Sequence, residues 1–402
     1  MKQITSIAKI PEKVTIPLQQ HVGVENRSLV IVGDVVKVGQ KIGESESGIS
    51  PVHSSVSGKV IEISKHPHPF YENTPTIIIE PNGKDSSIEF KAKDYSRQGR
   101  EQIIEIIKEA GIVESGIPVH TKLNLSDVVI LNGMDEPPYV AMNHALMLDF
   151  PDEIIEGLKI LMKATGASRG LIGIDIRDSD VINRMNRAVV DDSNIGTVSL
   201  KTTYVQGMEG LFAKAVVRKE LSHGQQISNA STMTVTVGTA KVVYDAVCTG
   251  KPMIETVITV LGTKKSQNVL VKIGTPVRDV IRHCGGYSGE PKKIIINGPM
   301  TGMAQYTDEV PIVKGTYGVF VQYEGDVSTV EPGPCINCAK CIDVCPVNLL
   351  PNMLVAFAGD ARFDMCENYN ISACVECGKC AYVCPSKIPI VQLIKYAKGW
   401  IK

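Results

Sequence analysis

Long hydrophobic runs are missing from this chain of 402 residues. No stretch reaches the roughly 18 to 20 consecutive apolar residues that a bilayer span needs. Residues 1–10 also lack the apolar core of a signal peptide. We therefore expect a chain without a transmembrane segment of its own, in the cytoplasm or peripheral on the inner face of the cell membrane. In that reducing compartment its cysteines are not expected to form disulfides.

An excess of charge of one sign is missing too, and aromatic residues are scarce. The 42 Lys and Arg residues balance 43 Asp and Glu residues, and aromatics make up 5% of the chain with a single tryptophan, Trp400. Nucleic-acid binding normally needs a basic surface and stacking aromatics, so we expect no nucleic-acid partner. The eight histidines show no metal-ligand spacing.

Cysteine is abundant in the last seventy residues. Two runs there have the pattern C-x2-C-x2-C-x3-C-P, and they consist of Cys335, Cys338, Cys341 and Cys345 before Pro346, and Cys374, Cys377, Cys380 and Cys384 before Pro385. A thiolate at every third position presents three sulfurs to one cubane, and in two-cluster ferredoxins the fourth cysteine of each run ligates the other cluster. The pattern predicts two 4Fe–4S clusters, one on Cys335, Cys338, Cys341 and Cys384, the other on Cys374, Cys377, Cys380 and Cys345.

Zinc and disulfides are the alternatives for these cysteines. Structural zinc sites usually come as two C-x2-C pairs separated by a loop, not as four cysteines in eleven residues ending in proline, so clusters are favoured. The remaining cysteines, Cys248, Cys284 and Cys366, are interpreted as packed or incidental thiols.

The length of the chain suggests several domains. Residues 1–90 contain short β-branched runs and are expected to form a barrel-sandwich domain, with strands at residues 14–16, 29–32, 35–38, 56–63 and 76–79. The stretches at 32–44 and 53–63 resemble the hammerhead strands of biotinyl and lipoyl carrier domains. A carrier lysine on a hairpin tip is missing, so a scaffold is favoured over lipoylation.

Residues 98–252 alternate between helical and strand periods. Helices are predicted at 100–110, 151–165 and 181–190, and strands at 128–131 and 171–176. This alternation predicts a largely parallel, Rossmann-like α/β domain. In residues 253–325, strands at 269–273 and 293–296 around a helix at 276–284 predict a β-grasp domain.

Residues 330–402 are expected to form a helical dicluster ferredoxin module. Its last helix carries Ile390, Leu393, Ile394, Ala397 and Ile401 at helical spacing, edged by Lys387, Lys395, Lys398 and Lys402. Two interpretations stay open: a helix packed on the cluster module, or a lysine-edged docking surface for an acidic redox partner.

This order of domains resembles the RnfC family over nearly the whole chain. The matching stretches are LQQHVG at 18–23, HSSVSGKV at 53–60, EIIEGLKILMKATGA at 153–167, GTPVRDVI at 274–281, INGPMTGMAQYT at 296–307 and CINCAKCIDVCPVNLLP at 335–351. The resemblance implies a barrel-sandwich domain, a Rossmann-like domain related to the flavin subunit of complex I, an SLBB-like β-grasp domain and a ferredoxin module. It also implies a subunit of a membrane ion-translocating ferredoxin:NAD oxidoreductase that exchanges electrons with NADH through FMN.

Four stretches depart from the family pattern. The glycine-rich loop GxGGAGFPT is here GIVESGIPVHTKL at 111–123, and NGAECEPY is NGMDEPPY at 132–139, with Pro137 in place of the second glutamate. The family's YPQGGEK is YVQGMEG at 204–210, where Met208 replaces a glycine, and its NVGT is TVGT at 236–239. Asp175, at a strand end, remains a candidate for a ribose hydroxyl, with a helix cap or a surface charge as the alternatives.

Because these departures fall on one nucleotide site while both cysteine runs are complete, we hypothesise an electron-transfer protein that lost direct NADH oxidation. Two 4Fe–4S clusters are its expected cofactors, and FMN is left open. It would relay electrons between a donor protein and a reductase, with D-proline reductase favoured as the acceptor. The alternative is the RnfC subunit of a membrane Rnf complex that exchanges electrons between NADH and ferredoxin via FMN. A cobalamin-reductase-like relative also stays open.

Overall fold

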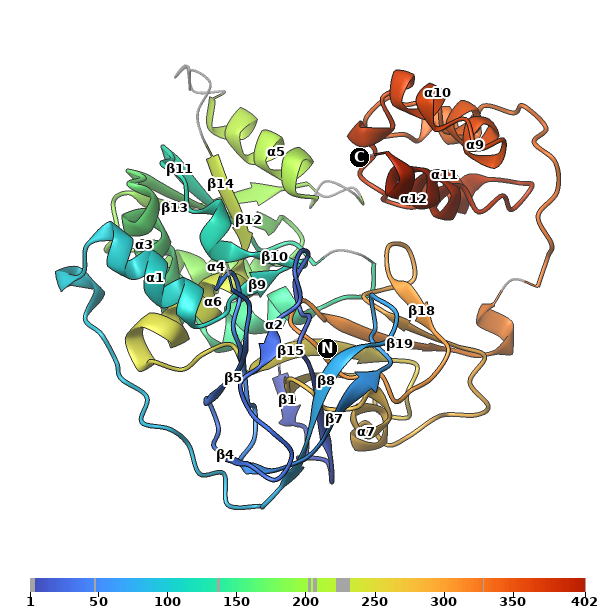
Figure 1. The fold of residues 1–402 in the computed structure, drawn as a ribbon. Coiled ribbons are helices and arrows are strands. Elements are labelled where there is room, and N and C mark those ends of the chain that lie inside the picture. Colours follow the sequence, from blue (N-terminus) through green and yellow to red (C-terminus); the bar gives the residue numbers. More distant parts are fainter. Residues whose placement is uncertain are drawn as a thin grey trace.

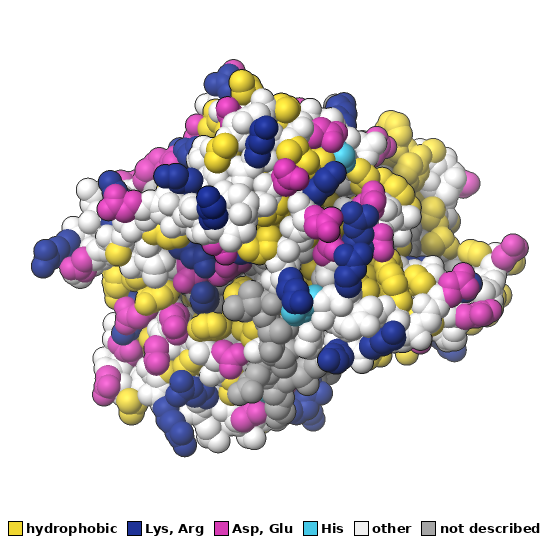
Figure 2. Space-filling view, turned by 90° about the horizontal axis from the view of Figure 1, so that it is seen from below, with side chains coloured by type: hydrophobic (Ala, Val, Ile, Leu, Met, Phe, Trp, Pro, Cys, Tyr) yellow, Lys and Arg dark blue, Asp and Glu magenta, His cyan; other side chains and the backbone are white. Residues whose placement is uncertain are grey.

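The computed structural model describes residues 4–46, 48–135, 138–201, 204, 208–221, 232–327 and 329–401. Along the chain these residues form a β-sandwich, a parallel α/β domain, a β-grasp domain and a helical C-terminal module (Figure 1). The predicted fold class is thereby confirmed. None of the described helices combines the length and the apolar character needed to cross a membrane. Basic and acidic side chains are interspersed over the face shown in Figure 2, in keeping with a net charge of −1.

The N-terminal sandwich consists of two small sheets. One has the strand order β2 (Val14–Pro17), β8 (Thr74–Pro81), β7 (Gly58–His66), β4 (Val35–Val36), and the other has β3 (Arg27–Ser28), β5 (Lys41–Glu44), β6 (Val52–His53). Successive strand residues face opposite sides of a sheet, so alternate residues meet in the core. Val14, Ile16, Ile77 and Ile79 are fully buried there.

The strand expected at residues 29–32 is wrong, because this segment is a turn. The Ser28 hydroxyl donates to the Val30 carbonyl at 2.6 Å, and the Asp34 carboxylate accepts from the Ile31 N–H at 2.9 Å. Short polar side chains thus satisfy the backbone locally, which competes with strand pairing. Leu29, Ile31 and Val32 are exposed as a result.

The α/β domain has a sheet of four parallel strands in the order β13 (Ile195–Leu200), β12 (Arg169–Asp175), β11 (Val128–Asn132), β14 (Thr232–Thr236). The largely parallel sheet predicted from the alternation is therefore confirmed. Its helices are α1 (Arg100–Glu109), α2 (Met142–Asp149), α3 (Pro151–Thr165), α4 (Ser179–Ala188), α5 (Glu209–Leu221) and α6 (Val237–Tyr244), the last continued by a wider turn, Asp245–Thr249. A hairpin of β9 (Val113–Glu114) and β10 (Ile117–Pro118) follows α1. Short 3-10 turns lie at Tyr95–Arg97 and Val119–Lys122.

Both faces of the parallel sheet are covered. Val129 and Leu131 of β11 pack with α1, α3, α4 and α6, while their neighbours Val128 and Ile130 pack with α5 on the other face. Helix α3 begins at Pro151, with Asp152 and Glu153 in its first turn, and ends before Gly166 in the left-handed conformation. These signals are visible in the sequence, and the expected range 151–165 is correct.

The β-grasp domain contains a six-stranded sheet with the order β1 (Ile4–Ile7), β16 (Gln267–Lys272), β15 (Glu255–Leu261), β19 (Gly318–Gln322), β17 (Lys293–Ile296), β18 (Met303–Gln305), packed by α7 (Val277–His283). A 3-10 turn, Glu324–Asp326, follows β19. Strand β1 pairs in parallel with β16. The expected first domain, residues 1–90, includes this strand, but the structure places it in the β-grasp sheet.

The C-terminal module is reached through an extended segment after β19 (Figure 1). It contains α8 (Lys340–Asp343), α9 (Pro351–Gly359), α10 (Phe363–Asn368), the 3-10 turn Ile371–Ala373, α11 (Lys379–Val383) and α12 (Ile390–Trp400). Its core combines aliphatic side chains such as Leu354 and Ile394 with several cysteines of the two runs.

Lys314 joins three of these units at one buried point. Its ammonium group donates to the carbonyl oxygen of Pro51 in the sandwich at 2.8 Å and to that of Gly111, after α1, at 2.7 Å. The side chain is 3% exposed, and this burial lowers its pKa to about 7. Gly111 has φ +62°, and a Cβ there would lie 2.3 Å from the Pro51 oxygen, so the close approach requires glycine.

We expect Lys314→Met to lower the thermal unfolding midpoint, because both carbonyl oxygens lose their partner; each costs about 1–3 kcal/mol when buried and unpaired. The pKa of Lys314 is lower in the folded state, so the folded wild type binds fewer protons above about pH 7 than the unfolded chain does. The wild-type advantage should therefore grow as pH rises from about 7 to 9. Circular dichroism melts of both proteins measure this, with Lys84→Met as the exposed control. Equal midpoints at every pH would contradict it.

Candidate functional site

The eight cysteines of the two runs line two separate cavities of the C-terminal module. One cavity is lined by Cys335, Cys338, Cys341 and Cys384, which we call the outer set. The other is lined by Cys345, Cys374, Cys377 and Cys380, which we call the inner set. Each cavity thus combines three cysteines of one run with the fourth cysteine of the other run. These are the two groups that the crossed pattern assigns to the two clusters.

The local structure of each run explains this grouping. The first two cysteines of each run lie on a loop, the third lies in the short helix that follows, α8 or α11, and the fourth comes just after that helix. Residues with positive φ, such as Asn337, Ala339, Glu376 and Gly378, turn the loops around the cavities. Helices α8 and α11 pack against each other, which brings the fourth cysteine of each run to the other cavity.

The chemistry of these cavities fits an iron–sulfur cluster. Their other lining residues are largely apolar, and burial, followed by the neighbouring Cys377, raises the pKa of Cys380 to about 12. Burial also raises the pKa of Cys374, Cys377 and Cys341. Four such thiols ionise together only when they coordinate cations, and thiolates are the usual ligands of 4Fe–4S clusters. Backbone N–H groups of Leu349 and Glu376 point at Cys345 and Cys374 sulfurs, at 3.3 and 3.4 Å.

The two sets differ in their surroundings. Cys335 and Cys338 of the outer set are exposed, beside Ile336, which is 64% exposed. The inner set faces the rest of the chain: the Tyr204 hydroxyl of the α/β domain donates to the Cys377 carbonyl oxygen. A Cβ at Gly378 would lie 2.7 Å from the Met300 carbonyl oxygen of the β-grasp domain, so the two backbones touch.

The last helix, α12, is packed on the cluster module, which is the first of the two interpretations of its apolar face. Ile390, Ile394 and Ala397 of α12 are buried. Two of the lysines have partners within the module: Lys398 donates to the Cys374 carbonyl oxygen at 2.7 Å and pairs with Glu376 at 2.9 Å, and Lys395, whose side chain is 39% exposed, lies 3.7 Å from Glu376. Both lysines are thus paired with the same glutamate. Lys402 lies outside the described residues.

The three other cysteines are packed thiols, as expected. Cys284 and Cys366 are fully buried, in the β-grasp core and in the C-terminal module, and Cys248 is half-buried. None of the three lines either cysteine cavity. The glycine pair 285–286 and Gly298 have positive φ and serve as turn residues.

The candidate nucleotide residues lie at the carboxyl ends of the parallel strands, where such sites occur. Asp175 is the last residue of β12, and the guanidinium of Arg177 already pairs with its carboxylate. Met134, after β11, is buried, and Met208 is half-buried. Of the departing stretches, Glu136, Pro137, Val205, Gln206 and Gly207 lie outside the described residues.

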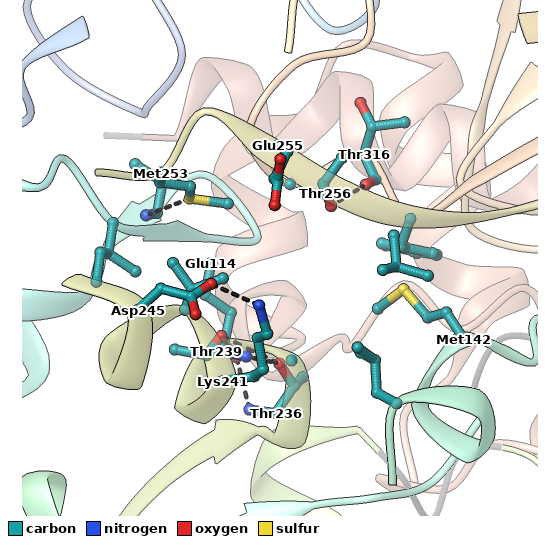
Figure 3. Close-up of a pocket in the computed structure, with 18 of the residues that line it drawn as sticks. Glu114, Met142, Thr236, Thr239, Lys241, Asp245, Met253, Glu255, Thr256 and Thr316 are labelled. Carbon is teal, nitrogen blue, oxygen red and sulfur yellow. Dashed lines mark hydrogen bonds and ion pairs between the residues drawn. The ribbon is translucent and has the colours of Figure 1, made fainter. Parts of the chain in front are cut away.

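A cavity lies between the α/β and β-grasp domains, bounded by the β9 end of the hairpin, α2, α6 and β15 (Figure 3). Its walls are mainly apolar, with Met142, Leu146, Phe150 and Met253 among them. Three carboxylates also line it: Glu114, Asp245 and Glu255. Asp245 is paired with Lys241 at 2.6 Å, and Glu255 is paired with Lys251.

The Glu114 carboxylate sits at the N-terminal end of α6. It accepts hydrogen bonds from the Thr236 N–H at 2.6 Å and from the Thr239 hydroxyl at 2.7 Å, and Lys122 lies 3.3 Å from its second oxygen. The Thr239 N–H is taken by the Thr236 hydroxyl at 3.1 Å. The donors that would face a phosphate at this helix end therefore already bind the Glu114 carboxylate. This arrangement does not fit an FMN molecule bound there through its phosphate.

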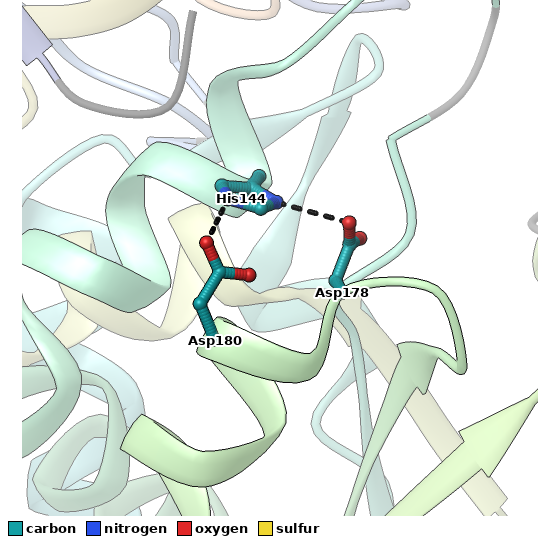
Figure 4. Close-up of side chains that lie close together, drawn as sticks. All are labelled: His144, Asp178 and Asp180. Atoms are coloured by element: carbon teal, nitrogen blue, oxygen red, sulfur yellow. Dashed lines mark ion pairs between the residues drawn. The ribbon is translucent and has the colours of Figure 1, made fainter.

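Sequence reasoning missed a constellation of His144, Asp178 and Asp180 (Figure 4). The two ring nitrogens of His144 face different carboxylates, Nδ1 at 3.3 Å from Asp178 and Nε2 at 3.6 Å from Asp180. One ring nitrogen and one oxygen of each acid lie within 4.8 Å of one another, a spacing that could hold a metal ion, while the shortest contacts place the imidazole ring between the two acids. The residues come from α2 and the start of α4, and no local spacing relates them.

A buried acid lies next to this histidine. The Asp135 carboxylate accepts from the backbone N–H groups of Asn143, at 2.9 Å, and His144, at 3.2 Å. Burial raises the pKa of Asp135 to about 7, while the hydrogen bond that the His144 ring donates to Asp178 raises the pKa of His144. Asp135 thus fixes the start of α2 at the end of β11, within the stretch that departs from the family pattern.

Four family models match the chain. They are the RnfC barrel sandwich hybrid domain at residues 1–84, the Nuo51 FMN-binding domain at 107–245, the SLBB domain at 257–304 and the 4Fe-4S dicluster domain at 334–388. The last match, together with the clustered cysteines, confirms the expected 4Fe–4S clusters as cofactors, and the second keeps FMN among the candidates.

Whole-chain relatives are similar over nearly the full length. A subunit of the Na⁺-translocating ferredoxin:NAD⁺ oxidoreductase complex of Acetobacterium woodii is 36% identical, covering 97% of this chain and 91% of its own. A subunit of the ion-translocating oxidoreductase complex of Methanosarcina acetivorans is 38% identical, with 99% and 94% covered. Its counterpart in the proton-translocating ferredoxin:NAD⁺ oxidoreductase complex of Clostridium ljungdahlii is 38% identical, with 98% and 89% covered.

Among solved structures, a chain of an NAD⁺-reducing NiFe hydrogenase in its H₂-reduced state has the same fold. The TM-score is 0.51 at 14% sequence identity, and the match covers 75% of this chain and 62% of the hydrogenase chain. At this identity the likeness shows the shared fold alone.

We expect His144→Gln to lower the thermal unfolding midpoint more at pH 6 than at pH 8. At pH 6 the loss in the free energy of unfolding should be about 1 kcal/mol. The pKa of His144 is raised in the folded state, so its pairing stabilises the fold below about pH 6.5 and is lost as pH rises through the folded pKa. Melts at the two pH values measure this. His283→Gln is the control, because burial lowers the pKa of His283 and the trend should reverse.

Proposed function

We propose that this chain, which belongs to the RnfC family, is an electron-transfer subunit of an ion-translocating ferredoxin:NAD oxidoreductase complex. The observation that carries the proposal is the pair of four-thiol cavities in a chain that is similar, from end to end, to subunits of such complexes. An isolated ferredoxin module would account for the cavities alone. Full-length similarity ties the module to the other three domains and to a complex.

In this proposal the eight cysteines hold two 4Fe–4S clusters. The outer set, Cys335, Cys338, Cys341 and Cys384, holds one cluster, and the inner set, Cys345, Cys374, Cys377 and Cys380, holds the other. Such clusters accept and release single electrons, at potentials set by N–H···S bonds and exposure. The chain's own residues fix the two cavities side by side and leave one of them partly open to solvent.

The two cysteine sets differ in exposure, and this difference supports a direction for the electron path through the module. The inner set contacts the α/β and β-grasp domains through Tyr204 and Met300, while two outer cysteines are exposed. We infer that the outer cluster exchanges electrons with a partner protein that docks against the C-terminal module. Other subunits of the complex supply the remaining donor or acceptor.

The named relatives are subunits of ion-translocating complexes, so we favour this assembly over a relay to D-proline reductase, which none of these relatives supports. The same relatives support a peripheral position on a membrane complex, on the side where ferredoxin and NAD are found.

The crossed assignment of ligands is tested with double variants. Cys384→Ser combined with Cys335→Ser removes two outer ligands, so about four iron atoms per chain should remain. Cys384→Ser combined with Cys374→Ser removes one ligand from each set, and both clusters should weaken or disappear. Iron and sulfide analysis and electron paramagnetic resonance of the dithionite-reduced protein measure this.

If each run instead held its own cluster, the two results would be exchanged: Cys384→Ser with Cys374→Ser would leave about four irons, and Cys384→Ser with Cys335→Ser would weaken both clusters. Cys366→Ser is the matched control, because this buried thiol lies outside both cavities and its replacement should leave about eight irons.

The physiological role is tested in membranes of cells that lack this chain. We expect them to lose electron transfer between reduced ferredoxin and NAD⁺, and to regain it on addition of the wild-type chain but not of the Cys384→Ser, Cys335→Ser variant. Full activity without the chain would refute the proposal. Loss of proline reduction with unchanged ferredoxin:NAD⁺ activity would instead support the reductase partner.

A further inference from the structure

The N-terminal end of α6 is a place in the flavin-type domain where a phosphate could bind. Helix α6 follows β14 at the carboxyl edge of the parallel sheet, and both lie within the segment, 107–245, that matches the Nuo51 FMN-binding domain. Unpaired N–H groups and the helix dipole make such a strand-to-helix junction a binding place for phosphate. FMN carries one phosphate group, so this end of the helix tests whether the chain fits the cofactor.

In this chain the Glu114 carboxylate fills the place. One of its oxygens accepts from the Thr236 N–H at 2.6 Å and from the Thr239 hydroxyl at 2.7 Å (Figure 3). The Glu114 side chain is 10% exposed, and Lys122, at 3.3 Å, balances its charge. Hydrogen bonds to a carboxylate are about twice as strong as neutral ones, so the contact is more than incidental packing.

The hairpin that carries Glu114 is itself held in place. Val113 and Glu114 of β9 pair with Ile117 and Pro118 of β10, and Ser115 and Gly116 make the turn with positive φ. At the start of the segment, the Gly111 carbonyl oxygen is bound by the buried Lys314. The carboxylate is therefore preorganised for α6, in the stretch 111–123 where the glycine run of the family is missing.

The cations around this helix end are already paired within the chain. Lys122 is paired with Glu114, Lys241 is paired with Asp245 and also lies 5.0 Å from the Phe150 ring, and the charge of Glu255 is balanced by Lys251. A phosphate that displaced Glu114 would leave a buried carboxylate without its hydrogen bonds next to a dianion. Both the lost bonds and the repulsion oppose binding.

We infer that Glu114 is an internal substitute for a ligand phosphate and that this chain does not hold FMN through the α6 end. The inference deepens the proposed function and rests on it for the two clusters. The subunit passes electrons through its clusters, and a partner protein supplies these electrons without a flavin bound at the α6 end. The fold of an FMN-binding domain is kept as a scaffold for the hairpin, the β-grasp contact and Tyr204.

The test is FMN binding to the full chain, purified anaerobically with its clusters. Wild type should contain no stoichiometric FMN and should leave the fluorescence of added FMN unquenched. Glu114→Ala should raise the affinity for FMN by about tenfold or more, since removal of the carboxylate frees the Thr236 and Thr239 donors. Riboflavin, which lacks the phosphate, should gain nothing.

Two further variants keep the test decisive. Glu114→Gln removes the charge with little change in shape and should gain part of the FMN affinity even if the alanine variant folds poorly. Glu255→Gln removes another carboxylate of the same cavity, away from α6, and should behave as wild type.

Stoichiometric FMN in the wild-type protein would overturn the inference, and so would equal FMN affinity of wild type and both Glu114 variants. Iron analysis of the same samples separates the two claims. Missing clusters would contradict the proposed function and leave the flavin result intact.

Discussion

The buried side chain of Lys314 is the constraint on which the arrangement of the first three domains depends. Its ammonium group binds carbonyl oxygens of the sandwich and of the segment after α1, and its own backbone N–H donates to the Gln20 side chain of the sandwich. A lysine is costly to bury, as its lowered pKa shows, and here the two carbonyl bonds offset that cost. The same contact fixes Gly111 and thereby the hairpin that ends near α6. The placement of the domains and the position of the hairpin near α6 therefore both depend on Lys314.

We expect the stability of the C-terminal module to depend on its cofactors rather than on a single buried contact. Its core is small, and three of the eight cysteines of the two runs are buried there beside a few aliphatic side chains. Modules of this size rarely bury enough apolar surface to be stable alone and are usually held by metals or disulfides. Crossed ligation would tie the two runs to each other through both clusters, so the cofactors would serve as structural links as well as conductors. Lys398 and Glu376, close to the inner set, then anchor α12 on this core rather than on a partner.

Much of the fold could be predicted from local sequence signals. The cysteine spacing, the caps of α3 and the β-branched strands of the parallel sheet each act within a few residues, and such signals survive without tertiary context. The turn at residues 29–32 could not be predicted from β propensity, because Ser28 and Asp34 satisfy the backbone instead. The pairing of β1 with β16 joins residues more than 260 positions apart, which no local pattern encodes. The same holds for His144 with Asp178 and for Glu114 with Thr236: the residues were visible, but the contacts that define them arise only on folding.

The Glu114 contact also suggests how a flavin-type domain can stay folded when no phosphate is bound at the α6 end. A domain that evolved around a bound phosphate has unpaired N–H groups at the helix end when the ligand is absent, and it loses the stabilisation that binding supplied. A carboxylate from the neighbouring hairpin repairs both losses, since it pairs the Thr236 N–H and places a negative charge at the positive end of α6. The hairpin then remains ordered beside the β-grasp domain, and the carboxyl edge of the sheet can still support Tyr204 against the inner cysteine set. In this view the nucleotide end of the domain has become part of the frame that positions the clusters.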